Sequence, residues 1–455
     1  MTNYLLGKTF SVHTLGCKVN TCESEAMRMM LTDCGCKEVS FGEICDITIV
    51  NTCTVTNIAD RKTRQMLHKA RAVSQHAVIV ALGCYVQKSG IAETDIPADV
   101  CIGNRRKGEI VHVLNDVYRR MEAGESAPFS YLEDAPRSEY EDLPPTVSQE
   151  RTRAFLKIQD GCNQFCSYCI IPYVRGRIAS RAPEQVVKEA TVLAGNGVHE
   201  IVLNGIHLSS YGLENHSARE IAELKPISGE LPLLTLLRKV AGIPGIERIR
   251  LGSLEPRIMT EDFIRGLSEI PSLCPQFHLS LQSGCDRTLA AMRRHYTTEQ
   301  YKEAVRLLRT YFDDPAITTD VIAGFPGETE EDFSESLAFI GEIGFAQVHV
   351  FPYSRRSGTL ADRMDGHLTE NCKKERAGRL IAAAESESVA YRTRWIGKEA
   401  RVLLEEPAPE YGDGFYRGYS REYIPYVVSA NADAVNREMT VIGSKILPDR
   451  SVLVQ

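Results

Sequence analysis

The sequence has no apolar run long enough to cross a lipid bilayer, and its first residues lack the apolar core of a signal peptide. We therefore expect a cytoplasmic protein with no membrane partner. The chain also lacks a basic excess, because its formal net charge is −7 at pH 7. This charge argues against nucleic-acid binding through the overall field of the protein, so any such binding must depend on local basic stretches.

Cysteine, in contrast, is plentiful, with 14 residues in a chain of 455. A reducing compartment keeps thiols free, so disulfides are not expected. Cysteines that cluster are better interpreted as metal ligands. The length predicts two or three domains, and the 43% apolar and 25% charged composition is that of a globular protein.

The N-terminal part alternates short apolar runs with helical stretches, which predicts a doubly wound parallel α/β domain over residues 1–121. The expected strands cover residues 10–15, 47–50 and 78–82, and the expected helices cover residues 23–32 and 60–73. A polar segment rich in Glu, Ser and Pro, residues 122–150, is predicted to be a linker.

A second strand–helix series predicts a partial (β/α)6 barrel over residues 151–390. Its six expected strands cover residues 154–159, 200–203, 248–252, 277–281, 317–322 and 347–351. After a helical stretch at residues 373–395, five short strand patterns predict a small antiparallel β-barrel over residues 391–455.

Three cysteines with the spacing Cys-x3-Cys-x2-Cys follow the first expected strand of this barrel: Cys162, Cys166 and Cys169. This loop lies on the face where barrel enzymes keep their catalytic residues. Three thiolates can hold three irons of a cubane cluster and leave the fourth iron open to a chelating substrate such as S-adenosylmethionine. A structural zinc site is the alternative, but zinc needs four closed ligands and no fourth ligand is nearby in the sequence.

Polar or glycine residues near the ends of the other barrel strands are candidates for binding S-adenosylmethionine. Gly324 belongs to Gly-Phe-Pro-Gly, in which glycine lets the backbone approach a nucleoside. Ordinary loop chemistry is the alternative for each position. The candidates are Tyr168, Asn204, Gly205, Ser253, Gln282, Ser283, Arg293, Ile322 and Gly324, and Arg294 is the alternative to Arg293 as the cation that meets the ligand's carboxylate.

A second set of cysteines, Cys17, Cys53 and Cys84, follows the ends of successive strands expected in the first domain. Their separations of 36 and 31 residues are about the length of one βαβ unit. Right-handed βαβ units bring strand ends to the same edge of a sheet, so the three thiols are predicted to converge on an auxiliary cluster. Three unrelated buried cysteines are the alternative.

With these motifs together, the chain resembles the methylthiotransferase family of radical S-adenosylmethionine enzymes over essentially its whole length. The resemblance lies in Leu-Gly-Cys-Lys-Val-Asn at residues 15–20, Asn-Thr-Cys at 51–53, Leu-Gly-Cys at 82–84 and the motif at 162–169. The last domain resembles the RNA-binding TRAM module. Within the family, the first two motifs are most similar to the bacterial tRNA threonylcarbamoyladenosine branch, the MtaB type.

The resemblance implies two 4Fe-4S clusters and two uses of S-adenosylmethionine. One molecule would donate a methyl group to sulfur at the auxiliary cluster. A second would be cleaved to a 5′-deoxyadenosyl radical, which removes hydrogen from C2 of the adenine beside the anticodon, at position 37. The methylthio group is then transferred to that carbon. The implied partners are a tRNA anticodon stem-loop and a flavodoxin or ferredoxin, and we expect a monomer.

Two basic stretches are candidates for contact with RNA phosphates. The helix after Cys53 carries Arg61, Arg64 and Arg71 at spacings that share one face. The segment after the radical motif carries Arg175, Arg177 and Arg181, which could bind phosphates or the acidic threonyl group of the substrate. The tyrosines of the last domain suit either base stacking or barrel packing.

Three other hypotheses remain open. The substrate can be N6-isopentenyladenosine in tRNA or a ribosomal protein rather than threonylcarbamoyladenosine. The chain can also be a non-enzymatic iron–sulfur protein that binds RNA, although such carriers normally ligate all four irons. A zinc-dependent RNA-binding protein is the third possibility.

Overall fold

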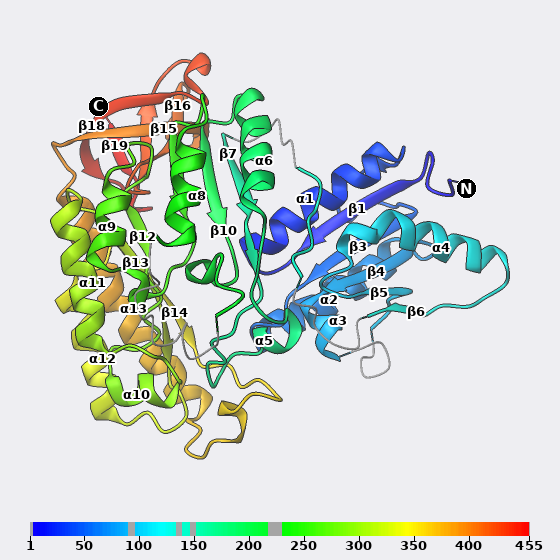
Figure 1. The fold of residues 1–455 in the computed structure, drawn as a ribbon, viewed down its shortest axis with the longest axis horizontal. Coiled ribbons are helices and arrows are strands. Elements are labelled where there is room, and N and C mark those ends of the chain that lie inside the picture. Colours follow the sequence, from blue (N-terminus) through cyan, green and yellow to red (C-terminus); the bar gives the residue numbers. More distant parts are fainter. Residues whose placement is uncertain (1–2, 90–95, 133–138, 146–151, 217–229, 455) are drawn as a thin grey trace.

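The computed structural model describes residues 3–89, 96–132, 139–145, 152–216 and 230–454. Figure 1 shows a parallel sheet with its helices on one side of the molecule and a larger half-barrel on the other. A small barrel at the C-terminal end packs against the half-barrel. No helix within the described ranges is both long enough and apolar enough to span a membrane.

The first domain is a six-stranded, wholly parallel sheet with the order β2-β1-β3-β4-β5-β6. Every residue of β3 and β4 is buried, as in a sheet covered by helices on both faces. The strands are β1 Thr9–Thr14, β2 Lys37–Glu38, β3 Ile47–Thr52, β4 Val78–Gly83, β5 Val100–Ile102 and β6 Phe129–Tyr131. The helices are α1 Lys18–Asp33, α2 Asn57–Val73, α3 Cys84–Ser89 and α4 Ile110–Glu122.

The second domain is a half-barrel of six parallel strands in two groups, β11-β10-β7 and β12-β13-β14. Two isolated parallel bridges, Ile249 to Leu273 and Leu254 to Leu279, join the groups. The strands are β7 Arg153–Lys157, β10 Glu200–Asn204, β11 Arg248–Leu251, β12 Gln276–His278, β13 Ala316–Ala323 and β14 Gln347–Pro352, with the short pair β8 Gln159–Asp160 and β9 Ala179–Ser180. The helices are α5 Ile171–Val174, α6 Pro183–Gly195, α8 Pro232–Ala241, α9 Glu261–Ser268, α10 Asp286–Ala291, α11 Thr298–Tyr311, α12 Glu330–Ile343 and α13 Glu370–Thr393.

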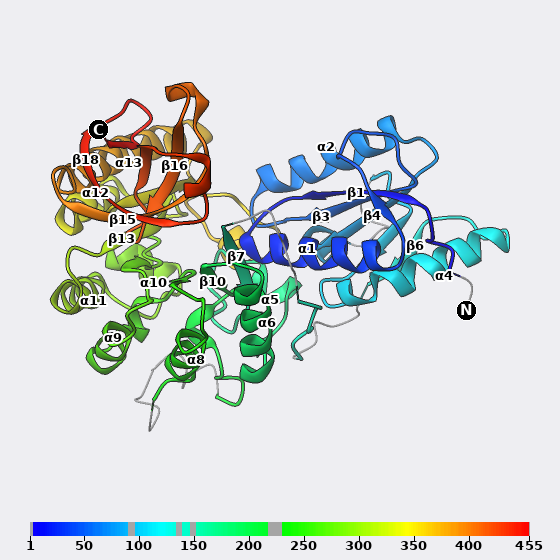
Figure 2. The ribbon, with the colours of Figure 1, turned by 90° about the horizontal axis from the view of Figure 1, so that it is seen from above.

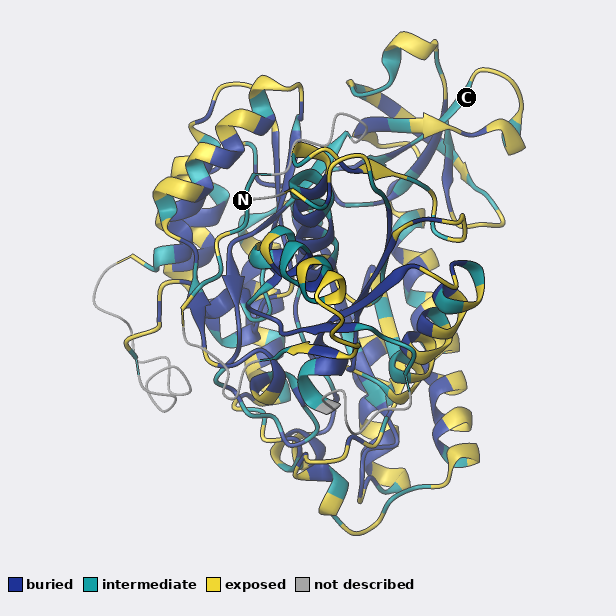
Figure 3. Ribbon diagram, turned by 90° about the vertical axis from the view of Figure 1, so that its right-hand side faces the viewer, coloured by how far each residue is buried: buried dark blue, intermediate teal, exposed yellow. Residues whose placement is uncertain are grey.

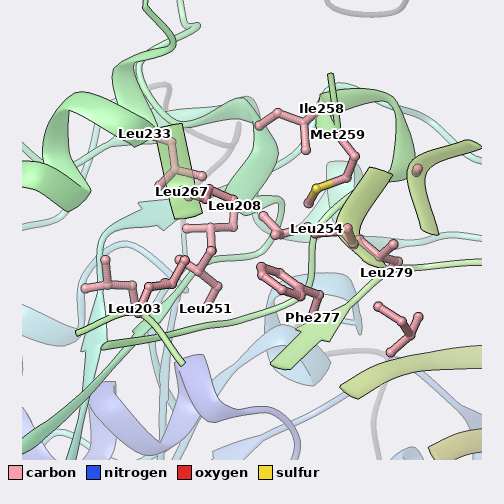
Figure 4. Close-up of a cluster of buried hydrophobic side chains, with 14 of the residues drawn as sticks. Leu203, Leu208, Leu233, Leu251, Leu254, Ile258, Met259, Leu267, Phe277 and Leu279 are labelled. Carbon is pink, nitrogen blue, oxygen red and sulfur yellow. The ribbon is translucent and has the colours of Figure 1, made fainter. Parts of the chain in front are cut away.

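The outer face of the half-barrel carries the largest apolar core of the protein. Leu203 of β10, Leu251 of β11 and Phe277 of β12 meet Leu233 of α8 and Leu267 of α9 there (Figure 4). Each fully buried leucine contributes about 1.5–3 kcal/mol of stability. The alternate strand positions, such as Arg250, His278 and Asp320, therefore face inward, and the helices turn their exposed sides to solvent (Figure 3).

The C-terminal domain is a closed five-stranded barrel with the order β15-β16-β17-β19-β18, which confirms the predicted small barrel. Four of its strand pairs are antiparallel as predicted, but β17 and β19 pair in parallel, so the barrel is not wholly antiparallel. Its strands are β15 Glu399–Pro407, β16 Phe415–Ser420, β17 Pro425–Ser429, β18 Glu438–Ile446 and β19 Val452–Val454. Tyr419 and Tyr423 stack on each other at 4.8 Å and on the guanidinium of Arg153 at 4.9 and 5.0 Å. Tyr426 is fully buried. These three tyrosines therefore serve packing and attachment rather than an open RNA-binding face.

The first domain extends farther than its sequence predicted. Strand β6 pairs with β5, although residues 129–131 lie inside the predicted linker 122–150. The described part of that linker also contacts both domains: Tyr140 donates a hydrogen bond to the Lys157 carbonyl, and Glu141 accepts one from the Gly108 amide. Strand β6 was missed because three residues are too few to show a period.

A buried cluster of charges joins the first domain to the half-barrel. The carboxylate of Glu23, on α1, has no solvent exposure and binds Lys107, Lys157 and Arg175. Lys157 and Arg175 also bind Asp160. Burial alone would raise the pKa of Glu23, but the charges of Arg175, Lys107 and Lys157 hold it well below its usual range.

We predict that Glu23→Gln lowers the free energy of unfolding by about 3–5 kcal/mol, because it leaves buried cations without their shared carboxylate. Thermal and urea unfolding of the full chain measure the change. Asp33→Asn, at the exposed end of α1, is the matched control and is expected to have little effect. Equal unfolding curves for both variants would contradict this role.

The same cluster predicts a direction for pH dependence. Because the folded-state pKa of Glu23 is depressed, its contribution is complete above the ordinary carboxyl pKa and is lost as the pH falls toward the folded-state value. Wild-type stability should therefore fall more steeply on acidification than that of Glu23→Gln. Parallel acid-unfolding curves for the two proteins would show that the carboxylate contributes nothing.

Candidate active site

The structure brings Cys17, Cys53 and Cys84 to the carboxyl edge of the first sheet, as their spacing predicted. Thr14 pairs with Asn51 and Thr52 pairs with Gly83, so the three strands end level with one another. Cys53 and Cys84 are buried, and Cys17 is exposed at the start of α1. Burial, and to a lesser degree the nearness of Cys84 and Cys17, raises the pKa of Cys53 to about 11.

The loop before Cys17 passes close to Cys53. Gly16 has φ +102°, and a β-carbon there would lie 2.8 Å from the Cys53 Cβ and 2.9 Å from its Sγ. Only glycine fits this approach. Asn20 then fixes both loops, because its side-chain amide donates to the carbonyls of Leu15 (2.7 Å) and Thr52 (3.0 Å). The motif asparagine thus positions the cysteines, a role that the sequence analysis did not identify.

Cys162, Cys166 and Cys169 lie on the loop between β8 and α5. Cys162 is buried and the other two are half-buried. Burial, followed by the nearness of Cys166, raises the pKa of Cys169 to about 12 and raises that of Cys162 as well. The Gln164 amide donates to the Cys162 sulfur at 3.4 Å, and Arg294 donates to the Cys166 sulfur at 3.2 Å.

Both cysteine sets fit iron–sulfur clusters by the chemistry of their donors. Each set gathers three sulfurs, and donors such as Arg294 and the side-chain amide of Asn104 (3.5 Å from the Cys84 sulfur) approach those sulfurs. No group of three or more His, Cys, Asp or Glu side chains within the described ranges is arranged to hold one metal ion. A cubane makes a different demand, because each of its thiolates binds a different iron.

The two cysteine sets are connected by direct packing contacts. Cys84 packs in a small buried cluster with Ile170, which directly follows Cys169 in the chain, and with Val174, at the end of α5. Asn104 links the same elements, donating to the Val174 carbonyl at 2.8 Å. Helix α5, which begins directly after the loop of the radical motif, therefore packs against Cys84 and brings the two cysteine sets close together.

The residues predicted to bind S-adenosylmethionine differ in burial, backbone conformation and packing around the half-barrel. Tyr168 and Ile322 pack against one cluster with Phe325. Gln282 adopts φ 69° and exchanges backbone hydrogen bonds with β13. Asn204 is buried, Ser253 is exposed, and Gly205 lies so close to Gln159 that a β-carbon would clash.

The other three candidates, Ser283, Gly324 and Arg293, differ in what they contact. Ser283 hydrogen-bonds Ser336 of α12 at 3.0 Å and is buried. Gly324 has φ +75° and lies against Lys373. Arg293 also has a positive φ, but its side chain is exposed, whereas the next residue, Arg294, turns toward Cys166.

A buried carboxylate at the mouth of the half-barrel was missed. Glu255 follows β11 and accepts hydrogen bonds from Gln164 (3.3 Å) and Arg257 (2.7 Å), and it contacts His207 at 3.2 Å. Burial would raise the pKa of Glu255, but His207, Arg294 and Arg257 hold it at about 2. The signal for this site was Ser-Leu-Glu-Pro directly after an expected strand.

The predicted RNA contacts need correction at two arginines. Arg175 and Arg181 are buried, at 1% and 5% exposure. Arg175 binds Glu23 and Asp160, and Arg181 binds Asp142 and Glu189. Their charges are neutralised inside the protein, so these two residues do not form a surface for phosphates.

The other four arginines predicted to contact RNA differ in their exposure and in their partners. Arg61 and Arg64 are exposed on α2, and Arg177 is exposed with its guanidinium 4.6 Å from the Phe165 ring. Arg71 is partly exposed but binds Asp99 at 2.5 Å and two backbone carbonyls.

Comparison with known proteins gives two family matches. Residues 156–340 match the radical SAM superfamily, and residues 9–103 match the uncharacterized protein family UPF0004. Among solved structures, the radical S-adenosylmethionine methyltransferase TsrM from Kitasatospora setae has a TM-score of 0.56 at 15% identity, covering 78% of this chain and 77% of its own. That likeness supports the fold alone.

Curated relatives match over most of the chain. Threonylcarbamoyladenosine tRNA methylthiotransferase MtaB of Bacillus subtilis is 36% identical, covering 95% of this chain and 93% of the relative. MtaB of Thermotoga maritima is 34% identical, covering 93% and 92%. The tRNA-2-methylthio-N(6)-dimethylallyladenosine synthase of Clostridium perfringens is 33% identical, covering 90% and 89%. The chain therefore belongs to the methylthiotransferase family of radical S-adenosylmethionine enzymes.

Proposed function

We propose that this enzyme converts N6-threonylcarbamoyladenosine at position 37 of tRNA to its 2-methylthio derivative. The observation that supports the proposal is the pair of three-cysteine sites joined through α5, which begins just after Cys169 and packs on Cys84. The substrate is suggested by the relatives from Bacillus subtilis, Aquifex aeolicus and Thermotoga maritima, which are named for threonylcarbamoyladenosine. The dimethylallyladenosine synthases, at 33–35% identity, support the alternative substrate.

The family implies one 4Fe-4S cluster and S-adenosylmethionine, and we propose a second cluster. Cys162, Cys166 and Cys169 would hold the first, and Cys17, Cys53 and Cys84 would hold the auxiliary one. When bound, the first cluster supplies the electron that cleaves S-adenosylmethionine and the second presents the sulfur. The protein holds the two cysteine-bearing loops in a fixed position relative to each other, because α5 packs directly on Cys84.

The residues around the first site are proposed to bind S-adenosylmethionine. Glu255 stays ionised at neutral pH, so it suits a cationic amino or sulfonium group. Of the two alternatives Arg293 and Arg294, Arg294 is the cation that faces the site. The remaining proposed contacts are Tyr168, Asn204, Gly205, Ser253, Gln282, Ser283, Ile322 and Gly324.

We also propose the partners. Arg61 and Arg64 on α2, the helix after Cys53, and Arg177 beside Phe165 of the Cys162–Cys169 motif are exposed cations, and they would contact the anticodon stem-loop. The electrons would come from flavodoxin or ferredoxin, and the working enzyme would be a monomer in the cytoplasm.

The two-cluster proposal predicts iron content. After anaerobic reconstitution, the wild type should hold about eight irons per chain, and a Cys17/Cys53/Cys84→Ala or Cys162/Cys166/Cys169→Ala variant about four. Cys372→Ala, outside both sets, should keep about eight. Iron and acid-labile sulfide analysis measures this. Four irons in the wild type and four in the first variant would mean that the auxiliary cysteines hold no cluster.

The contact of Arg294 with the Cys166 sulfur predicts that this arginine raises the reduction potential of the proposed first cluster. Arg294→Gln removes a positive charge and an N–H···S hydrogen bond, which favour the more negative, reduced cluster. The midpoint potential should fall by about 60 mV or more, since 59 mV is a tenfold change for one electron. Potentiometric titration in the Cys17/Cys53/Cys84→Ala background isolates one cluster. Arg293→Gln is the matched control, and equal potentials in both variants would contradict the assignment.

The substrate proposal predicts a product. Reconstituted enzyme, reductant and S-adenosylmethionine are incubated with anticodon stem-loops that carry threonylcarbamoyladenosine, isopentenyladenosine or adenosine at position 37. Nucleoside mass analysis should find the methylthio product from the first RNA. Product from the isopentenyladenosine RNA alone would replace this proposal with the alternative substrate.

A further inference from the structure

The lysine directly after Cys17 points into the half-barrel. Lys18 begins α1, which lies beside β7 in Figure 2. Its ammonium lies 5.7 Å from the ring centroid of Phe155, on the inner face of β7. Lys18 is exposed and forms no ion pair within the part of the chain that the structure describes. Its charge is therefore close to the auxiliary cysteines and available to a ligand.

The neighbouring cations are already neutralised. Arg175 and Lys157 bind Glu23 and Asp160. Arg153 binds Glu405 at 2.8 Å, and Arg250 binds Glu200 at 3.0 Å.

Lys18 occupies an unfavourable place for a cation. It stands at the first position of α1, and the N-terminal end of a helix dipole is positive, so the lysine gains nothing from the helix. An anion next to Lys18 would offset this unfavourable placement.

The facing side of the half-barrel is polar and accessible. His278 hydrogen-bonds Thr318 at 3.0 Å and contacts the carboxylate of Asp320 at 3.4 Å. The rings of His278 and His349 are 6.1 Å apart, and His349 is exposed. These groups offer several donors and acceptors opposite Lys18.

The two candidate substrates differ in the chemistry that such a surface recognises. A threonylcarbamoyl group carries a carboxylate, a hydroxyl and ureido N–H groups. A dimethylallyl group carries none of these and gains nothing from an unpaired ammonium. A charge-assisted hydrogen bond to a carboxylate is also among the stronger polar contacts.

We infer that Lys18 is a specificity-determining residue, which binds the carboxylate of the N6-threonylcarbamoyl group as the adenine approaches the auxiliary cysteines. The hydroxyl and ureido groups would then face His278 and Asp320. This inference rests on the proposed function. It assigns substrate choice to a residue next to Cys17 rather than to the buried Arg175 and Arg181.

Binding of stem-loop RNAs tests the inference without depending on turnover. Affinities for the threonylcarbamoyladenosine and unmodified RNAs are measured by fluorescence anisotropy with the apo and the reconstituted full chain. The wild type should prefer the modified RNA by about ten-fold or more, the range of one charged hydrogen bond. Lys18→Gln should lose this preference, and Lys18→Arg should keep most of it. Lys374→Gln, an exposed lysine on α13, is the matched control.

The outcomes separate this inference from the function on which it rests. If the wild type methylthiolates the threonylcarbamoyladenosine RNA and Lys18→Gln keeps the full preference in both forms, the inference is wrong and the function stands. If Arg177→Gln alone loses the preference, the carboxylate binds at Arg177 instead. If the wild type does not modify that RNA at all, the proposed function fails first.

Discussion

The buried carboxylate of Glu23 fixes how the two domains meet. Glu23 lies on α1, six residues after Cys17, and receives Lys107 from its own domain and Lys157 and Arg175 from the half-barrel. A carboxylate without solvent exposure is costly to bury unless several donors reach it together. Lys107 reaches this carboxylate within the first domain, and the observed arrangement of the domains adds Lys157 and Arg175. Arg175 also donates to Asn20 at 2.6 Å, and Asn20 holds the loops of Cys17 and Cys53.

This geometry suits an enzyme in which sulfur and radical chemistry must meet at one atom of the substrate. Arg175 follows Cys169 by six residues, so one ion cluster fixes the loops of both cysteine sets. A second contact between the domains lies in the segment after Cys53, where Arg356, after β14, binds Asp60 of α2 at 2.7 Å. Contacts at two separate places restrict rotation as well as translation between the domains.

The sequence predicted what depends on local pattern and topology. Strand ends separated by βαβ units placed Cys17, Cys53 and Cys84 together, and the spacing of Cys162, Cys166 and Cys169 marked the second site. It did not predict which arginines are buried, because Arg175 and Glu23 lie 152 positions apart. Nor did it distinguish Arg293 from Arg294, since the choice follows from a backbone turn with positive φ at Arg293.

The ion pairs show why a chain with a net charge of −7 does not attract RNA through its overall field. Many cations around the two sites, such as Arg175, Arg181 and Arg250, are balanced by buried carboxylates and add little to a field that would attract RNA. Under the proposed function, recognition of the RNA would then depend on cations that stay unpaired within the described ranges. Lys18 is one of them and lies next to Cys17, so the groups proposed to select the nucleoside and those proposed to modify it share one loop.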